Sequence, residues 1–447
     1  MTHFGHNLKA VFLLLLASSM VLSSQSGFAS AYEHNNYSER KQIKESIKLI
    51  KQGKHIFRYD TFGNESFWGE QLRLHEAIAG EQFGGVGPGI SPKTALALGL
   101  KVDVDALPRS VKKKLRRGRV DLESPATTLA LLKLNAVIGV SATFDENETL
   151  QSVGITCALC HTQVDDSLAP GIGKRLDGWA NRDLNIGAII AAAPNLNPFS
   201  TLLGVGEDTV RAVLNSWGPG KFDAELLLDG KAFRPDGKSG ATLIPPAFGL
   251  AGVNLHTWTG WGSVAHWNAL VAVLEMGGKG NFFDPRLDDS NKFPIAAANN
   301  FGNIRISEEQ DQVTAKLPAL HLYQISLAAP TPTVGENKTE SIKRGKNVFT
   351  TKAGCNRCHV PPLYTEPGWN LHKAEELGID NFQASRSPDE GYRTSPLKGL
   401  WTHHKGGFYH DGRFQTLRDV INHYDRFFDL QLDDVEKEDL ENFLNSL

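Results

Sequence analysis

The sequence predicts a mainly α-helical protein built from two related units, the first of which is enlarged by a long insertion. Two observations indicate this architecture. The pattern Cys-x-x-Cys-His occurs twice, over 157–161 and 355–359. A segment with helical spacing that combines Glu-Ser-Ile-Lys with Gly-Lys-x-(Ile/Val)-Phe also occurs twice, over 45–57 and 340–349. The second copy lies just before its cysteine motif, whereas a long stretch separates the first copy from its own, which predicts an internal repeat with an insertion.

The Cys-x-x-Cys-His pattern is typical of c-type haem attachment. Two thiols add to the vinyl groups of one haem, and the following histidine binds the iron. The two motifs use all four cysteines of the chain, so a zinc site or a redox dithiol explains the pattern less well. The sequence therefore predicts two cytochrome c-like domains, each with a covalently bound haem c. The attachment residues and proximal ligands are Cys157, Cys160, His161, Cys355, Cys358 and His359.

The N-terminus has the three parts of a secretory signal. Lys9 precedes an apolar run over 10–17, and small residues follow up to 31. We therefore expect residues 1–31 to be a signal peptide and the mature protein to lie in the periplasm; an uncleaved anchor is the alternative. No other stretch is apolar enough to span a membrane. The formal net charge of -3 argues against nucleic acid as a partner.

We expect an N-terminal haem domain over 32–330, with the insertion near 64–150, and a C-terminal haem domain over 335–447. The boundary falls among the turn-forming residues near 330–333. The first helix, over 37–57, is expected to pack an isoleucine face on its haem domain. A basic run over 109–119 is interpreted either as a docking surface for an acidic partner or as a solvated charge run.

The two units also align without a gap from Pro246 and Pro396 onward. This alignment places Leu274 at the position of Tyr424. Because leucine cannot bind iron, the first haem is expected to be open and reactive unless Met276 or a histidine binds it. Met276 is either a metal ligand or a core residue. His256 and His266 are the candidate catalytic acid–base residues, and both are also candidate ligands.

Tyr424 is the expected sixth ligand of the second haem. No methionine follows Met276, so the ligand must be oxygen or imidazole. On the helix, Tyr424 shares an apolar face with Leu417, Val420 and Ile421, whereas His423 is expected to point to solvent. The alternative ligands are three histidines: His403, His404 and His410. The final helix is expected to begin with a capping box at Asp433 and Glu436, and to include Val435 in its apolar face.

Three residues that follow the first motif are candidates for supporting roles. Arg175 and Arg182 can bind haem propionates, since a guanidinium matches a carboxylate in geometry, although both also fit a surface position. Trp179 is a candidate electron relay between the haems, with a buried core tryptophan as the alternative.

The segments over 393–400, 408–413 and 416–424 resemble the signature region of the bacterial dihaem cytochrome c peroxidases and of the dihaem enzymes that mature methylamine dehydrogenase. The resemblance is specific from about 343 to 447, and the secreted rubber oxygenases share the signature. It implies two helical cytochrome domains that face each other, electron transfer between the haems, and peroxide or oxygen chemistry at one of them. The position of Tyr424 holds methionine in the peroxidases and tyrosine in the methylamine-dehydrogenase-maturing branch.

Together these features predict a periplasmic dihaem oxidoreductase that reduces peroxide or activates oxygen at the N-terminal haem, while the C-terminal haem relays electrons. The alternative is a dihaem electron-transfer cytochrome without a substrate. A small redox protein is the expected electron donor or acceptor, and calcium is a further candidate cofactor.

Overall fold

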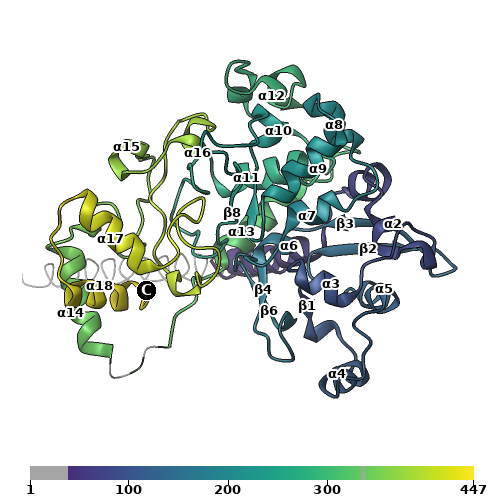
Figure 1. Ribbon diagram of the computed structural model, residues 1–447, viewed down its shortest axis with the longest axis horizontal. Helices are drawn as coiled ribbons and strands as arrows, with labels where there is room; N and C mark the ends of the chain where they lie inside the picture. Colours follow the sequence, from purple (N-terminus) through teal and green to yellow (C-terminus); the bar gives the residue numbers. More distant parts are fainter. Residues whose placement is uncertain (1–38, 334, 336–337) are drawn as a thin grey trace, which may run out of the picture.

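The structure is a computed structural model that describes residues 39–333, 335 and 338–447; the expected signal peptide lies outside these residues. Helices predominate and the strands are short, which confirms a mainly α-helical chain. A large body contains about the first three quarters of the chain, and a smaller lobe contains α14 (Thr339–Thr350), α17 (Leu417–Phe427) and α18 (Asp434–Leu444) (Figure 1). None of the helices in the described ranges is both long and apolar enough to cross a bilayer.

The body begins with a helix over 39–59 and continues through many short elements. Its α-helices are α2 (Leu74–Ala79), α3 (Pro92–Ala97), α4 (Arg109–Arg116), α5 (Pro125–Lys133), α6 (Ala158–His161), α7 (Ile186–Ala191), α8 (Asn197–Leu203), α9 (Glu207–Ser216), α10 (Leu226–Asp229), α11 (Val264–Leu270), α12 (Pro294–Ala298) and α13 (Leu317–Ser326). Two π-helical turns, η1 (Ser66–Gln71) and η4 (Val271–Glu275), extend this set. The loops between body and lobe contain α15 (Ala374–Leu377) and α16 (Phe382–Ser385).

Among the described residues the strands form five two-stranded ribbons, which the sequence pattern did not predict. They pair as β1 (Val102–Asp103) with β5 (Ile172–Gly173), β2 (Val140–Phe144) with β3 (Leu150–Ile155), β4 (Thr162–Val164) with β6 (Arg175–Asp177), β7 (Lys221–Phe222) with β8 (Thr242–Leu243), and β9 (Phe282–Phe283) with β10 (Asn303–Ile304). Only the first pair is parallel. The first cysteine motif lies between β3 and β4, so the two ribbons fix both of its ends.

The repeated helical segment packs in the same way in both halves. A Cβ atom on Gly53 would overlap the carbonyl oxygen of Ala319 in α13, and one on Gly345 would overlap that of Asp439 in α18. Each glycine therefore permits a close helix crossing. Four residues further on, Phe57 meets Tyr323 edge to face with ring centroids 5.5 Å apart, and Phe349 meets Phe443 at 5.2 Å.

A second correspondence supports the gap-free alignment of the two halves. Gly249 and Gly399 both have a positive φ, of 65° and 75°, which favours glycine. The amide of Gly249 donates to the carbonyl of Leu327, just after α13, and that of Gly399 donates to the carbonyl of Leu447, after α18. The order of first helix, cysteine motif, later helix and terminal helix thus occurs twice.

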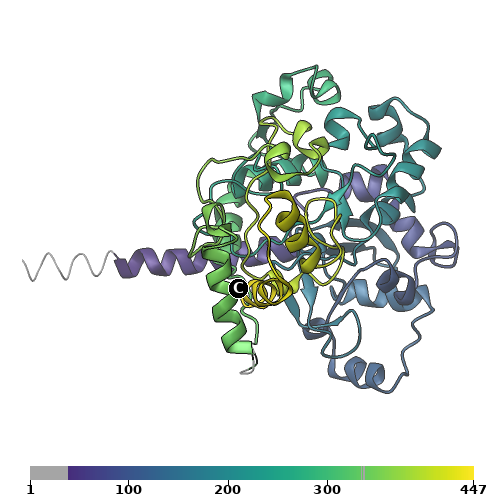
Figure 2. The same ribbon diagram turned by 60° about the vertical axis from the view of Figure 1, so that its left-hand side comes forward.

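Two expectations about helix faces were wrong in part. Ile43 and Ile47 are 58% and 48% exposed, because the helix over 39–59 extends beyond the body before it packs (Figure 2). Only its later turns are buried, as at Ile56. The capping box of α18 forms between Asp433 and Glu436, but Val435 is 61% exposed, since it follows the cap on the outer side of the helix.

The predicted insertion packs into the same core as the first cysteine motif. Trp68 of η1 belongs to a buried apolar cluster that also contains Leu159 of the motif and Val153 of β3. The basic run forms helix α4, with Val111 and Leu115 against a small apolar cluster. Within the described residues, no lysine or arginine of α4 forms an ion pair.

Buried ion pairs join the lobe-side loops to the body. Arg386, just after α16, is fully buried and lies 2.8 Å from both Asp223 and Asp229. Gln383 donates to Glu225 at 2.5 Å. Charges that leave water require close partners, so these contacts fix α16 against α10.

Candidate functional site

The first motif is held by the residues that follow it in the chain. Cys157 precedes α6, and His161 ends it. The carbonyl of His161 accepts from the amide of Gly178, and that of Cys160 accepts from the amide of Asn181, both at 2.8 Å. Burial raises the pKa of Cys157 and Cys160 to about 12. Both cysteines are half-buried.

His161 is neutral. Burial lowers its pKa to about 4, and its Nδ1 is buried with no hydrogen-bond partner among the described residues. A neutral imidazole has the lone pair that an iron ligand needs.

The second motif has a similar arrangement. Its cysteines lie on a single 3₁₀ turn, η8 (Cys355–Arg357), and the amide of His359 donates to the carbonyl of Cys355 at 2.9 Å. Burial lowers the pKa of His359 to about 4. Its Nδ1 lies 3.3 Å from the carbonyl oxygen of Tyr364. If Nδ1 donates this bond, Nε2 is left free to bind a metal.

Two buried arginines indicate where anionic groups of a ligand would lie. Arg182 is 7% exposed, and among the described residues neither of its Nη atoms has a hydrogen-bond partner. Burial lowers its pKa to about 10. Its guanidinium lies beside Gly406, so this residue of the body reaches the C-terminal half. A buried cation of this kind needs an anion, and a haem propionate fits.

Arg393 is the counterpart that sequence reasoning missed. It comes from the C-terminal half, its Nη1 donates to the carbonyl of Leu255, and its amide donates to the carbonyl of Trp258 at 3.0 Å. Its Nε is buried with no partner in the described chain, and burial lowers its pKa to about 10. The sequence feature that could have identified Arg393 is its place in the segment over 393–400, which carries the family resemblance.

Arg175 has a different environment. Its Nε donates to Asp103 at 2.6 Å, and both side chains are almost fully buried. Its guanidinium also lies over the ring of Tyr59. Because Asp103 neutralises it, Arg175 is the weaker of the two candidates for binding a propionate.

The two candidate catalytic histidines lie in different surroundings. His256 is buried with Nε2 3.0 Å from the carbonyl of Val253, and burial lowers its pKa to about 4. His266 lies near the start of α11, with Nε2 3.5 Å from Asp284 and its ring against Trp261. Within the described residues, no hydrogen bond, ion pair or aromatic contact joins either histidine to a cysteine motif.

Met276 is 4% exposed within an apolar core cluster, and its carbonyl accepts a hydrogen bond from Trp68 Nε1 at 2.9 Å.

Glu275, the neighbour of Met276, is another residue that sequence reasoning missed. Burial raises the pKa of Glu275 to about 8, with contributions from Glu225 and Asp223, and its Oε1 is buried without a described partner. Glu275 in turn contributes to the raised pKa of Cys160, so it lies near the first motif. The sequence feature that could have identified Glu275 is that it is a single acidic residue in the apolar stretch over 270–276.

Tyr424 lies near the second motif. Burial raises the pKa of Tyr424, and the thiols of Cys355 and Cys358 add to the rise. On the same helix, Leu417 and Ile421 belong to the apolar cluster against which Cys355 packs. The ring centroids of Tyr409 and Tyr424 are 6.2 Å apart, and the Tyr409 hydroxyl is buried with no hydrogen-bond partner among the described residues.

The other histidines of the C-terminal half have separate contacts. His404 is exposed, His410 stacks on Tyr392 with centroids 4.9 Å apart, and His403 is close enough to Arg182 for that charge to lower its pKa further, after burial. His423 does not point to solvent as expected. It is half-buried, and its Nε2 lies 2.8 Å from the carbonyl of Leu377, because the loop after α15 covers this face of α17.

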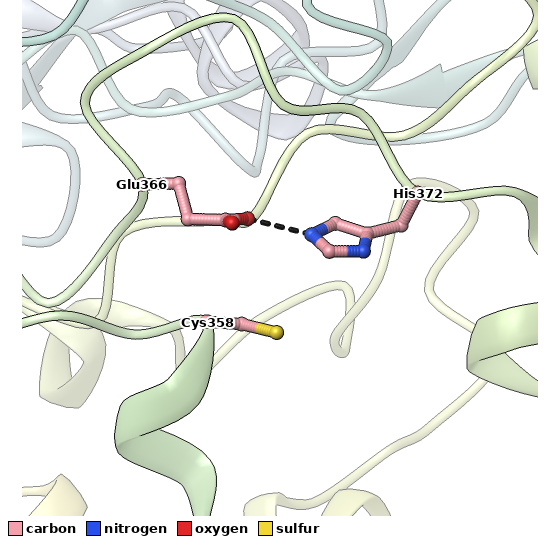
Figure 3. A group of neighbouring side chains, drawn as sticks. All are labelled: Cys358, Glu366 and His372. Atoms are coloured by element: carbon pink, nitrogen blue, oxygen red, sulfur yellow. Dashed lines mark hydrogen bonds and ion pairs between the residues drawn. The ribbon is translucent and has the colours of Figure 1, made fainter.

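Two further clusters have the donor atoms of a metal site. Cys358, Glu366 and His372 come within 4.8 Å of one another, and Figure 3 shows the sulfur below the Glu366–His372 pair. The pair is 2.6 Å long. Although burial alone would lower it, the pKa of His372 is raised by Glu366 and by Glu376. A histidine stabilised as a cation competes with a metal, so this cluster is better explained as an ion pair.

The second cluster contains Asp380, His410 and Asp411. Its carboxylates already pair with arginines: Arg413 contacts both aspartates, and Arg234 also contacts both. Two guanidinium groups therefore supply the positive charge that a calcium ion would otherwise bring.

Trp179 lies between the two halves. Gly178, just before it, bonds to the first motif, and the ring of Trp179 meets that of Trp401 edge to face with centroids 5.5 Å apart. Trp401 donates from Nε1 to the carbonyl of Pro330 at 3.0 Å. The segment that leads to Trp401 includes Ser395, whose backbone lies near His359.

Comparisons with known proteins add little to this geometry. No protein-family model matches the chain, and no curated protein matches it. Among solved structures, the chain is similar to the dihaem peroxidase BthA from Burkholderia thailandensis, at 17% sequence identity and a TM-score of 0.32. The match covers 52% of this chain and 78% of that one. Similarity at this level does not define a family, so the functional argument rests on the residues themselves.

Proposed function

We propose that this chain is a secreted, periplasmic dihaem c-type oxidoreductase that reduces peroxide or activates oxygen at the first haem. The observation that carries the proposal is the pair of Cys-x-x-Cys-His motifs, each with half-buried cysteines and a half-buried histidine whose pKa is lowered to about 4 by desolvation. Cys157, Cys160 and His161 would hold one haem, and Cys355, Cys358 and His359 the other. Bound haem supplies an iron that changes oxidation state. Arg182 and Arg393 would neutralise the propionates.

The two sites differ at one position in the alignment of the two halves, where Leu274 of the first half matches Tyr424 of the second. The second site has Tyr424, an oxygen donor close to its thiols. The first has Leu274, which offers no ligand atom, and next to it Glu275. With its pKa raised to about 8, Glu275 holds a proton at neutral pH and can donate it from the carboxyl group. This makes Glu275 a better candidate acid–base residue than His256 or His266.

The contact between Trp179 and Trp401 supports a role for the second haem as an electron relay. The contact joins a segment bonded to the first motif with the segment that passes His359. The basic helix α4 offers unpaired positive charge to an acidic redox partner, which would steer association.

The second candidate function is electron transfer without a substrate. Tyr424 favours this function at the second haem only, because an iron with all six ligand positions filled suits outer-sphere electron transfer. At the first haem, Leu274 and Glu275 favour an iron that keeps one position free for a substrate.

Absorption and electron paramagnetic resonance spectra of the ferric holoprotein, before and after addition of cyanide, test the proposal. One high-spin haem that binds cyanide, beside one that does not, is the expected result. Two low-spin haems that ignore both cyanide and peroxide would leave only the electron-transfer cytochrome.

A further inference from the structure

A large apolar cavity lies next to the first motif. Its volume is about 1140 Å³, and its walls come from η4 and from α8, α9 and α10, which lie together in one part of the body (Figure 1). Most lining side chains are aliphatic or aromatic, among them Trp68, Phe199, Trp217 and Leu228. The polar ones are Thr209, Asp223, Glu275, Lys279, Glu309, Gln310 and Gln312. Val205 and Phe233 also line it and are 39% and 48% exposed, so the cavity opens to solvent at that end.

The inner end of the cavity reaches the proposed acid–base residue. Leu274 and Glu275 both line it, and Leu274 packs against the same apolar cluster as Cys157 of the motif. Cys160 packs against the core cluster that contains Trp68 and Trp217 of the cavity wall. The two cysteines and the histidine of the motif do not themselves line the cavity, so the cavity adjoins the motif without being the space between its attachment residues.

We propose that this cavity binds an uncharged, largely hydrocarbon organic molecule, and that molecules of this class are the electron-donating substrate of the first site. The inference rests on the proposed function and adds the substrate class to it. Cavities of this size with mostly apolar walls and a few polar groups are typical of sites for small organic ligands. Asp223, which also lines the cavity, pairs with Arg386. The other charged lining residues are Glu275, whose pKa burial raises to about 8, and the exposed Lys279 and Glu309, which have opposite charges, so the cavity has little net charge.

The redox balance of this reaction is complete with peroxide as the oxidant. Two hydrogen atoms leave bound substrate, either both from one molecule or one from each of two molecules. One hydrogen peroxide molecule takes up both hydrogen atoms, its O–O bond breaks, and two water molecules form.

The first experiment measures binding to the secreted holoprotein by equilibrium dialysis with N-phenyl-1-naphthylamine, a neutral apolar probe. We expect saturable binding of one probe per chain. Val205→Trp, at the open end, should weaken it at least tenfold, and Thr209→Arg, which adds a charge to the lining, should do the same. Val360→Trp is the matched control, since Val360 is 40% exposed and lies outside the cavity; it should bind as the wild type does.

The second experiment measures peroxide-dependent oxidation of 1-naphthol. Val205→Trp should raise KM at least fivefold with little change in kcat, and Val360→Trp should change neither. No saturable probe binding, binding unchanged in both cavity variants, or binding without oxidation by haem-loaded protein would each overturn the inference. Absence of haem from the intact mass would instead refute the proposed function, and the probe experiment would still report on the cavity.

Discussion

Trp179 and Trp401 meet edge to face across the two halves of the molecule, with ring centroids 5.5 Å apart and an interplanar angle of 86°. Trp179 comes from the segment that binds the backbone of the first motif, and Trp401 from the loop that passes the second. Neither residue is a buried core tryptophan, since both are half-buried at the junction. Their contact lies on the electron path that we propose between the motifs.

We expect Trp179→Phe to slow electron transfer between the haems at least tenfold. Phenylalanine keeps a ring against Trp401 but removes the more easily oxidised indole. Rapid partial reduction followed by absorption spectroscopy measures the redistribution rate. Trp369→Phe, at a site 75% exposed, is the control and should leave the rate unchanged. An equal rate in wild type and Trp179→Phe would show that electrons take another path.

The intact mass of the secreted protein should exceed the processed polypeptide by two haem masses. A variant with Cys157→Ser and Cys160→Ser should carry one haem, because each thioether bond needs a cysteine thiol and this variant has none at the first motif. His372→Ala removes a donor of the cluster near Cys358 and should leave the mass increase unchanged apart from the substitution. An excess of one haem or none in the wild type would refute attachment at both motifs.

Tyr424→Phe should convert the second haem from low spin to high spin in the ferric state and leave the first haem unchanged. The substitution removes the phenol oxygen and leaves the aromatic ring in its place on α17. Tyr409→Phe is the control: it removes the hydroxyl of the neighbouring ring, whose centroid lies 6.2 Å from that of Tyr424, and should leave both haems as in the wild type. If Tyr424→Phe leaves the spectrum as it was, the ligand is one of the histidines, and His403, His404 and His410 should then be replaced in turn.

Arg386→Met should destabilise the fold by about 3–5 kcal/mol, because it leaves Asp223 and Asp229 buried without their partner. Urea unfolding followed by circular dichroism measures the change. Lys405→Met is the control: Lys405 is 57% exposed on the side chain and pairs with Asp183, and loss of such a pair costs about 0–1 kcal/mol. A change in the free energy of unfolding as small as that of the control would mean that Asp223 and Asp229 become protonated in the variant at little cost in stability.

The stability of the wild type relative to Glu225→Gln should fall as pH rises from about 5 to 8. Burial raises the pKa of Glu225 from 4.5 to about 8, although Arg386 opposes the shift. The folded state therefore binds a proton that the unfolded state releases, and this contribution is complete below pH 4.5 and lost through pH 8. The expected difference in slope is at most about 1.4 kcal/mol per pH unit.

Urea unfolding at several pH values measures this difference. Glutamine preserves an acceptor for Gln383, so packing should change little. Parallel stability curves for the two proteins would show that Glu225 stays ionised in the folded state.

The sequence predicted features that depend on local spacing. The Cys-x-x-Cys-His motifs, the repeated helix with Gly53 and Gly345, and the alignment of Gly249 with Gly399 are all properties of neighbouring residues. Each reappears in the structure as a turn, a close helix crossing or a positive φ. The mainly helical class followed from the same periodicity.

Only the tertiary structure decided which distant side chains meet. Glu275 and Arg393 became candidate site residues because burial and the absence of a partner depend on the whole fold, and neither can be read from adjacent residues. The same is true of His423, which a loop covers, and of the apolar cavity. A sequence states which groups are present, but desolvation and charge pairing arise only when chain segments far apart in the sequence exclude water from the same volume.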